Sequence, residues 1–153
     1  MPITIRQLEP EDAVACDAIV AGLPEWFADE DGIRECAEAV RTAEGLVLDA
    51  GGGPVAFVTF EPRYATTAEV TWIAVDAGLR DRGHGTALLD ALAVRLREEG
   101  VRLLLAKTLS DREDPGAAYA ATRAFYLARG FVPVVELDIW GPDNPCQLLA
   151  KPL

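Results

Sequence analysis

The most constraining feature of the sequence is a glycine-containing turn between an apparent buried strand and an amphipathic helix. The turn runs from Leu79 to Ala87 and reads Leu-Arg-Asp-Arg-Gly-His-Gly-Thr-Ala. The stretch before it, Glu69 to Val75, is apolar on both faces towards its end, as a central strand should be. The helix expected from about Gly83 to Glu99 places leucines on one stripe, at positions Leu88, Leu92 and Leu96. This order of elements favours an α/β fold.

The turn has the chemistry of a diphosphate-binding site. Backbone N–H groups in the first turn of a helix have no partners within it and lie at its positive dipole end, so they can hold a pyrophosphate. Gly83 and Gly85 carry no side chains that would keep phosphate oxygens away. Arg80 and Arg82 add positive charge.

The spacing of the turn excludes two common phosphate motifs. No lysine stands where a P-loop requires one, and the residue at the third position of a dinucleotide fingerprint is Leu88. Arg80, Gly83 and Gly85 instead resemble the acetyl-CoA motif of GNAT acetyltransferases: Gln or Arg, two residues, Gly, one residue, then Gly or Ala. The segment from Ala124 to Phe131 resembles the family's second motif, Phe-Tyr, three residues, then Gly-Phe.

Two helices are expected after a short N-terminal strand. Ile3 to Arg6 alternates as a strand does, and Pro10 to Asp12 suits the start of a helix that would continue to Leu23. A second helix is expected from about Asp31 to Thr42. Helical spacing predicts the buried faces of the two helices: Val14, Ala18 and Ile19 on the first, and Ile33, Ala37 and Val40 on the second.

The rest of the chain adds strands and one more helix. Leu46–Leu48 and Val55–Phe60 predict a hairpin around Gly51–Gly53. Strand Val101–Ala106, a helix ending at Arg129, and a closing strand pair at Phe131–Ile139 and Cys146–Ala150 should follow. The expected order is β-α-α-β-β-β-α-β-α-β-β in one domain over residues 1–153. Strands linked both by hairpins and by helices imply a mixed central β-sheet flanked by helices, which is the GNAT fold that the resemblance implies.

Composition limits the partners and the compartment. Fourteen Lys and Arg against 25 Asp and Glu give a formal net charge of -11, which opposes nucleic acid. Such acidity either attracts a cationic or amine substrate or simply favours solubility. No apolar run approaches the roughly 20 residues of a membrane span, and no secretory signal is evident, so we expect a cytoplasmic protein. The three cysteines, far apart and never in a close pair, suggest neither a disulfide framework nor a metal site.

The resemblance implies acetyl-CoA as acyl donor and assigns residues to it. Tyr126 would be the acid that protonates the departing sulfur. Backbone groups of Ile73, Ala74 and Val75 would contact the pantetheine arm and the thioester carbonyl. The pyrophosphate would lie on the turn residues Arg80, Arg82, Gly83, His84, Gly85 and Thr86. Tyr119 stands where many relatives have an asparagine that contacts the pantetheine arm, so that contact is either lost or made by the tyrosine hydroxyl.

The general base is harder to choose. Some relatives keep a glutamate near Glu69 that deprotonates the amine through water, but a solvent-exposed strand glutamate is an equal alternative. The acidic loop of Asp111, Glu113 and Asp114 could act as base or bind a cation, although a short solvated charge run is the commoner explanation. His84 occupies the variable position of the motif, so its backbone rather than its imidazole is expected to serve the phosphates.

Acetyl transfer to a primary amine is therefore the predicted function, with an unidentified acceptor, small molecule or protein, and no metal. A noncatalytic acyl-CoA binding or sensing module is the alternative, and a nucleotide-binding regulator is a third reading. Trp26, Phe27 and Trp72 either wall the acceptor pocket or are ordinary core aromatics. The segment Trp140 to Pro145 is either a loop over the site or a plain hairpin turn. A homodimer is plausible by family habit.

Overall fold

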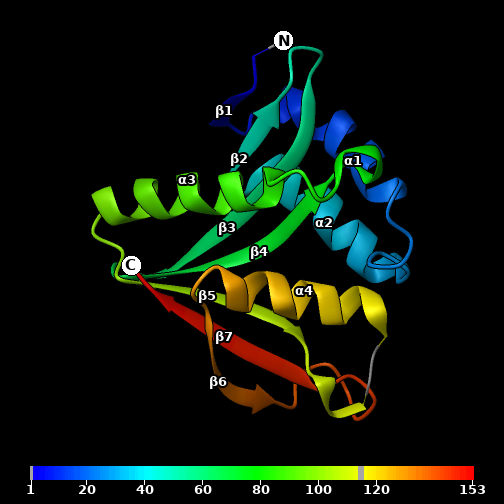
Figure 1. The fold of residues 1–153 in the computed structure, drawn as a ribbon, viewed down its shortest axis with the longest axis vertical. Helices are drawn as coiled ribbons and strands as arrows, with labels where there is room; N and C mark the ends of the chain where they lie inside the picture. Colours follow the sequence, from blue (N-terminus) through cyan, green and yellow to red (C-terminus); the bar gives the residue numbers. More distant parts are fainter. Residues whose placement is uncertain (1, 114–115) are drawn as a thin grey trace.

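The computed structural model describes residues 2–113 and 116–153, with the side chain of Glu113 excepted. One seven-stranded sheet runs through it in the order β1-β2-β3-β4-β5-β7-β6 (Figure 1). The strands are β1 (Thr4–Gln7), β2 (Glu44–Asp49), β3 (Pro54–Tyr64), β4 (Thr67–Val75), β5 (Leu103–Leu109), β6 (Val132–Leu137) and β7 (Cys146–Pro152). The helices are α1 (Ala13–Ala21), α2 (Glu30–Thr42), α3 (His84–Glu98) and α4 (Ala117–Ala128), with short 3-10 turns at Pro10–Asp12, Ala77–Leu79 and Asp111–Glu113. The expected element order is confirmed.

Strand pairing makes the sheet mixed, as expected. β4 and β5 pair in parallel, and every other neighbouring pair is antiparallel. The crossover between β4 and β5 is α3, which is why the two strands can run in the same direction. The predicted hairpin is the β2–β3 pair, and the predicted closing pair is β6–β7, with β7 inserted between β5 and β6.

Two apolar layers cover the two faces of the sheet. α3 and α4 lie across one face (Figure 1), where Leu88, Leu92 and Leu96 of α3 are fully or almost fully buried against Phe60 and Phe131. The leucine stripe predicted for this helix is confirmed. The second layer lies between the sheet and helices α1 and α2 and contains, among others, Cys16, Cys36, Val47, Phe57 and Ala74. None of the described helices is both long enough and apolar enough to cross a membrane.

The face predicted for α1 was partly wrong, since only Ile19 of its three residues is buried. Val14 is 75% exposed and Ala18 is also exposed, whereas Ala13, Cys16, Ile19 and Val20 are buried. This helix is apolar almost all round, so helical spacing does not single out one stripe. The face predicted for α2 was also partly wrong. Val40 is buried as predicted, but Ile33 is 40% exposed and Cys36 is buried in its place.

β4 contains an irregularity that determines how its side chains face. Thr59 pairs with Trp72 while the next residue of β3, Phe60, pairs with Val70, so Thr71 is an extra residue on β4. Such a bulge shifts the alternation of side chains by one position. Val70 therefore packs on the α3–α4 side, whereas Trp72 and Ala74 pack towards α1 and α2.

The bulge coincides with the point where the sheet opens. β4 pairs with β5 only from Thr67 to Val70, against Leu103 to Ala106. Beyond that point β5 continues to Leu109 beside β7, and the second half of β4 has a strand partner only on its β3 side. The sheet is thus split over part of its width, between its two central strands.

Candidate active site

The split in the sheet forms the floor of a cleft of about 1480 Å³. One end of the cleft lies against the turn before α3, and we call it the cofactor end. The other end lies against α2, the loop before it and the first half of β4, and we call it the acceptor end. Of the residues predicted from the sequence, the following line the cleft: Glu69, Ile73, Ala74, Val75, Arg80, Gly83, His84, Gly85, Thr86, Tyr119 and Tyr126. Arg82 is exposed and does not line it.

The turn at the cofactor end has an unusual backbone. Asp81 has φ 62° and Gly83 has φ 83°, both in the left-handed region, and α3 begins at the next residue, His84. A side chain at Gly83 would meet no atom within 4 Å. The space above the first turn of α3 is therefore open, and its unpaired backbone N–H groups can reach an anion there.

Gly85 has a second reason to be glycine. A Cβ built on it would lie 3.2 Å from Cζ of Phe125 in α4, so the ring occupies the space that a side chain would need. The neighbouring Tyr126 packs edge-on against Phe131 with ring centroids 5.1 Å apart. The two sequence motifs are therefore in direct contact, since the second motif supplies the ring that closes over the first.

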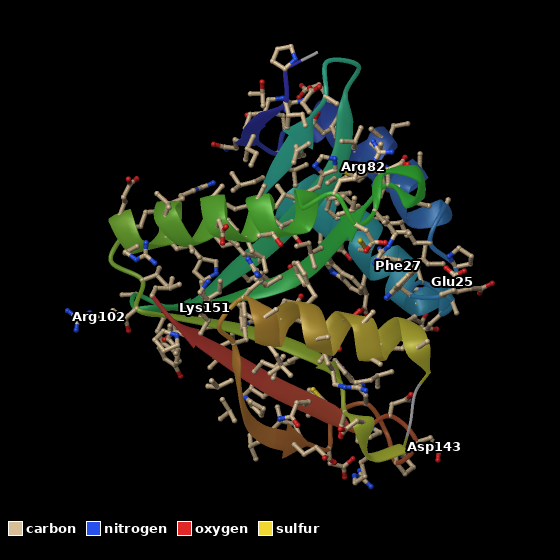
Figure 2. All side chains as sticks on the ribbon, in the orientation of Figure 1. Glu25, Phe27, Arg82, Arg102, Asp143 and Lys151 are labelled. Atoms are coloured by element: carbon tan, nitrogen blue, oxygen red, sulfur yellow. The ribbon has the colours of Figure 1, made fainter. Side chains whose placement is uncertain are left out.

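Arg80 does not point freely into the open space. Its guanidinium lies over the ring of Trp26, 4.2 Å from the centroid, as a cation–π pair. Arg82 comes from the same turn and Phe27 from the loop before α2 (Figure 2). The predicted phosphate-binding arginines therefore differ: one is stacked inside the cleft on an aromatic side chain from the acceptor end, and the other is at the surface.

Trp26 joins the loop before α2 to α4 through three hydrogen bonds. Its indole Nε1–H donates to the carbonyl of Ala118 and to Oγ1 of Thr122, both at 3.1 Å and both on α4. Its own carbonyl accepts a hydrogen bond of 3.1 Å from the hydroxyl of Tyr119. Burial raises the pKa of Tyr119, so this hydroxyl stays protonated as a donor. The hydroxyl thus holds the loop before α2 rather than standing free for a pantetheine arm.

Tyr126 is 5% exposed and lines the cleft. Burial raises its pKa above the ordinary value for a phenol, so the hydroxyl is neutral at physiological pH. Within the described part of the chain, no residue forms a hydrogen bond with this hydroxyl, and no sealed side-chain polar atom lacks a partner. The hydroxyl therefore opens into the cleft, where a ligand can meet it.

Glu69 is buried, at 6% exposure, which removes the alternative of a solvent-exposed strand glutamate. Its Oε1 lies 3.1 Å from Nε of Arg63 on β3, and its Oε2 lies 3.2 Å from Nζ of Lys107 on β5. Both cations hold the carboxylate in place while they compete for its lone pairs. Sequence reasoning had not identified either cation, because they come from other strands and only the pairing of the sheet brings them to Glu69.

Aromatic side chains form much of the acceptor end. Phe27 and Trp72 are 5.8 Å apart between ring centroids, and both are half-buried, packing on the core beneath while lining the cleft. These rings therefore belong to the core and also line the cleft, and their contact with an acceptor stays a prediction. Trp140 and Asn144 also line the cleft, which places the segment between β6 and β7 beside the site.

The acidic loop contributes little to the cleft in the described part of the chain. Asp111 is exposed and lies outside the lining residues. Asp114 lies outside the described residues, as does the side chain of Glu113.

Comparisons with known proteins agree on one family. The acetyltransferase (GNAT) domain model matches residues 41–133, more than half of the chain. No curated protein sequence matches closely enough to count as a relative. The fold is similar to that of a protein from Desulfovibrio desulfuricans described as an acetyltransferase of the GNAT family, with 22% identity, a TM-score of 0.86 and 99% of each chain covered.

Two further similar structures are described as having a ligand bound. A GNAT family acetyltransferase from Elizabethkingia anophelis with acetyl-CoA bound has 16% identity and a TM-score of 0.73, with 99% of this chain and 98% of the other covered. An aminoglycoside 6'-N-acetyltransferase complexed with coenzyme A has 18% identity and a TM-score of 0.74, with 97% and 96% covered. At these identities the likeness concerns the fold.

Proposed function

Because this chain belongs to the GNAT family of acetyltransferases, we propose that it transfers an acetyl group from acetyl-CoA directly to a primary amine. Acetyl-CoA supplies the acetyl group as an activated thioester. The neutral amine nitrogen bonds to the acetyl carbon as the bond from that carbon to sulfur breaks. The proton that nitrogen loses balances the proton that sulfur gains.

The cofactor end suits a CoA-like ligand. The open first turn of α3 presents backbone N–H groups and the positive end of the helix dipole to the pyrophosphate. The edge of β4 from Thr71 to Val75, which has no strand partner on the β5 side, offers backbone groups to an extended pantetheine arm and to the thioester carbonyl. We assign Ile73, Ala74 and Val75 to this second task.

Tyr126 is assigned as the proton donor to the departing sulfur. Its neutral hydroxyl opens into the cleft without a protein partner among the described residues. This free hydroxyl is the observation that carries the proposal, since it opens into the cleft and can donate to a ligand there. Burial raises the pKa of Tyr126, which keeps the hydroxyl protonated and able to donate to the departing sulfur.

Glu69 is assigned as the general base, acting through water. It lines the same cleft and is the only carboxylate on the described part of β4. Its two cationic neighbours hold it in place. An amine that enters as an ammonium ion must lose a proton before it can attack, and a carboxylate beside the acceptor end can receive that proton.

A second copy of the chain is part of the proposal. β6 is an edge strand of the sheet. Three of its valines, Val132, Val134 and Val135, are between 47% and 55% exposed, and an exposed apolar edge strand favours pairing with another chain. Light scattering on the purified protein tests this point, and a monomer at all concentrations would remove the homodimer.

Calorimetric titration with acetyl-CoA, followed by a thiol-release assay against a panel of amines, tests the function. Binding followed by CoA release that depends on an amine would support acetyl transfer. Binding without transfer to any amine would favour a noncatalytic acyl-CoA sensor. Absence of acetyl-CoA binding would overturn the proposal, and preferential binding of ATP or NAD would favour a nucleotide-binding regulator.

A further inference from the structure

On α2, carboxylates line the cleft and the arginines do not. Asp31, Glu35 and Glu38 line the cleft, whereas Arg34 and Arg41, the two arginines of the helix, do not. Arg41 is bonded to Asp17 of α1 on the outer side, and Arg34 is paired with Asp31. The helix thus presents carboxylates, and no basic side chain, to the acceptor end.

Glu35 and Glu38 are the unpaired members of this set. Neither forms an ion pair or a side-chain hydrogen bond with any described residue. They stand three positions apart on one helix, where like charges oppose each other. Two unmatched carboxylates on the wall of a cleft would be stabilised by a cation that enters it.

The cations that line the acceptor end do not neutralise it. Arg63 is bonded to both Glu61 and Glu69, and Lys107 is bonded to Glu69. Within the described part of the chain, six carboxylates line this end: Asp29, Asp31, Glu35, Glu38, Glu61 and Glu69. Against them stand Arg63 and Lys107, Arg34 paired with Asp31, and Arg80 stacked on Trp26, which leaves two more carboxylates than cations. The excess of negative charge therefore remains facing the cleft.

Aromatic surface lies beside these carboxylates. A Cβ on Gly32 of α2 would lie 4.0 Å from Cη2 of Trp72 and 3.7 Å from Oδ2 of Asp29, so the indole and a carboxylate meet where this helix lacks a side chain. Phe27 packs against the same indole. Aromatic faces next to carboxylates attract alkylammonium groups through both charge and cation–π interaction.

Tyr126, a side chain that is 95% buried, directs a hydroxyl with no hydrogen-bond partner among the described residues into the same cleft. A reacting amine must be neutral when it attacks, so it has lost the charge that the carboxylates of α2 would recognise. An acceptor with a single amine gains little from Glu35 and Glu38 at that stage. A second cationic group on the acceptor keeps its charge and continues to gain from them.

We propose that the acceptor is a dication or polycation: an amine that carries at least one further positive charge on an aliphatic chain, with that second charge held by Glu35 and Glu38 of α2. The first amine reacts near Tyr126, and the chain between the charges lies over Trp72 and Phe27. The inference rests on the proposed function, because it names the substrate class of the same site.

The experiment compares linear α,ω-diamines of increasing length with the monoamine and the ω-amino acid of each length. Binding to the CoA-loaded protein is measured by calorimetry, and acetyl transfer from acetyl-CoA is measured by thiol release. We expect at least one diamine to bind about tenfold more tightly than its monoamine and its amino acid, with an advantage that shrinks as salt is added. Equal affinity of diamines and monoamines at every length would overturn the inference.

The matched variants are Glu35→Gln with Glu38→Gln together, and Glu30→Gln as control. Glu30 is exposed on the same helix, does not line the cleft and pairs with no described residue. The double variant should raise KM for the preferred diamine roughly tenfold while KM for the monoamine and kcat stay the same, and Glu30→Gln should change neither. An equal KM for the diamine in both variants would also overturn the inference.

The two proposals fail in different ways. If diamines bind in preference but are not acetylated, the cation site stands and acetyl transfer falls. If monoamines are acetylated as well as diamines, and the double variant has no effect, acetyl transfer stands and the cation site falls.

Discussion

The cofactor end of the cleft comes from neighbouring segments of the chain, whereas the acceptor end is assembled from segments scattered along it. The first consists of the second half of β4, the turn before α3 and the start of α3, all within residues 71–86. The second takes Trp26 and Phe27 from a loop, carboxylates from α2, Lys107 from β5 and Trp140 from the segment after β6. The first end relies on backbone groups and the second on side chains, so a shared family fold can keep one and vary the other.

Replacing Tyr126 with phenylalanine tests the point where the two ends meet, and it should have the largest effect. Loss of the hydroxyl should lower kcat by roughly 10²–10⁴, since a proton donor is removed, while the Kd for acetyl-CoA stays unchanged. Stopped-flow or steady-state thiol release measures the first quantity and calorimetry the second. Near-normal kcat, with chemistry shown to limit the rate, would remove the assignment.

Tyr119→Phe is the matched control on the same helix. It deletes a hydroxyl that is bonded to the carbonyl of Trp26, so it should cost about 1 kcal/mol of unfolding free energy without a comparable fall in kcat.

Glu69→Gln separates the chemistry of the acceptor end from that of the cofactor end. We expect kcat/KM to fall by about 10² for a strongly basic amine and much less for a weakly basic one, which arrives already neutral. Without the base, the rate should follow the neutral fraction of the acceptor, which rises about tenfold per pH unit below the amine's pKa. The measurement is kcat/KM against pH for amines of different basicity.

Glu61→Gln is the control for Glu69→Gln, because Glu61 is the other carboxylate bonded to Arg63. If Glu69→Gln lowers the melting temperature but affects strongly and weakly basic amines alike, Glu69 is a structural partner of Arg63 and Lys107 rather than a base.

Gly83→Ala perturbs the cofactor end alone. A left-handed backbone costs a residue with a Cβ about 1–2 kcal/mol, and no atom stands in the way of that Cβ. If the turn shifts to relieve the strain, the Kd for acetyl-CoA should rise roughly five- to thirtyfold, with little change in acceptor specificity. Gly100→Ala is the matched control, since Gly100 has φ 89° and equally open space just beyond the other end of α3. The idea fails if both variants weaken acetyl-CoA binding equally.

Trp26→Phe should have the smallest effect, and this effect should appear at both ends of the cleft. The change removes the indole N–H that bonds Ala118 and Thr122, at a cost of about 1 kcal/mol. Because Arg80 stacks on the same ring, both the Kd for acetyl-CoA and the KM for the acceptor should change a few-fold. Trp140→Phe, at an indole whose N–H bonds no described residue, should leave the Kd for acetyl-CoA unchanged. An effect on the acceptor alone would mean that Arg80 does not couple the ends.

The contrast between the ends also explains what the sequence could predict. Gly83, Gly85, Phe125 and Tyr126 belong to short motifs whose spacing is fixed by one turn and one helix, and all of them line the cleft. The function of Gly85 was only half predicted, because its contact with Phe125 joins residues that lie 40 positions apart in the chain. Their assigned roles in catalysis stay predictions.

The acceptor end could not be predicted in the same way. Glu35 and Glu38 look in the sequence like the solvated face of an amphipathic helix, and only the packing of α2 beside the opening of the sheet turns them towards a cleft. The bulge at Thr71 reverses the side-chain alternation of β4, and no residue type in the sequence indicates a bulge there. The buried face of α1 was only partly predicted, because small apolar residues, mostly alanine and valine, occupy almost every side of the helix.

The parting of β4 from β5 has a consequence for how the protein exchanges its amide protons. On the side of β4 that faces β5, pairing stops at Val70, so amide groups between Thr71 and Val75 that point into the cleft have no strand to shield them from water. They should take up deuterium early, while the amides of β5 that point towards β7 take it up late. A ligand that completes the missing edge would slow the first group and leave the second unchanged. Deuterium uptake at these amides, measured by mass spectrometry, would therefore show whether a ligand occupies the cleft before any acceptor is known.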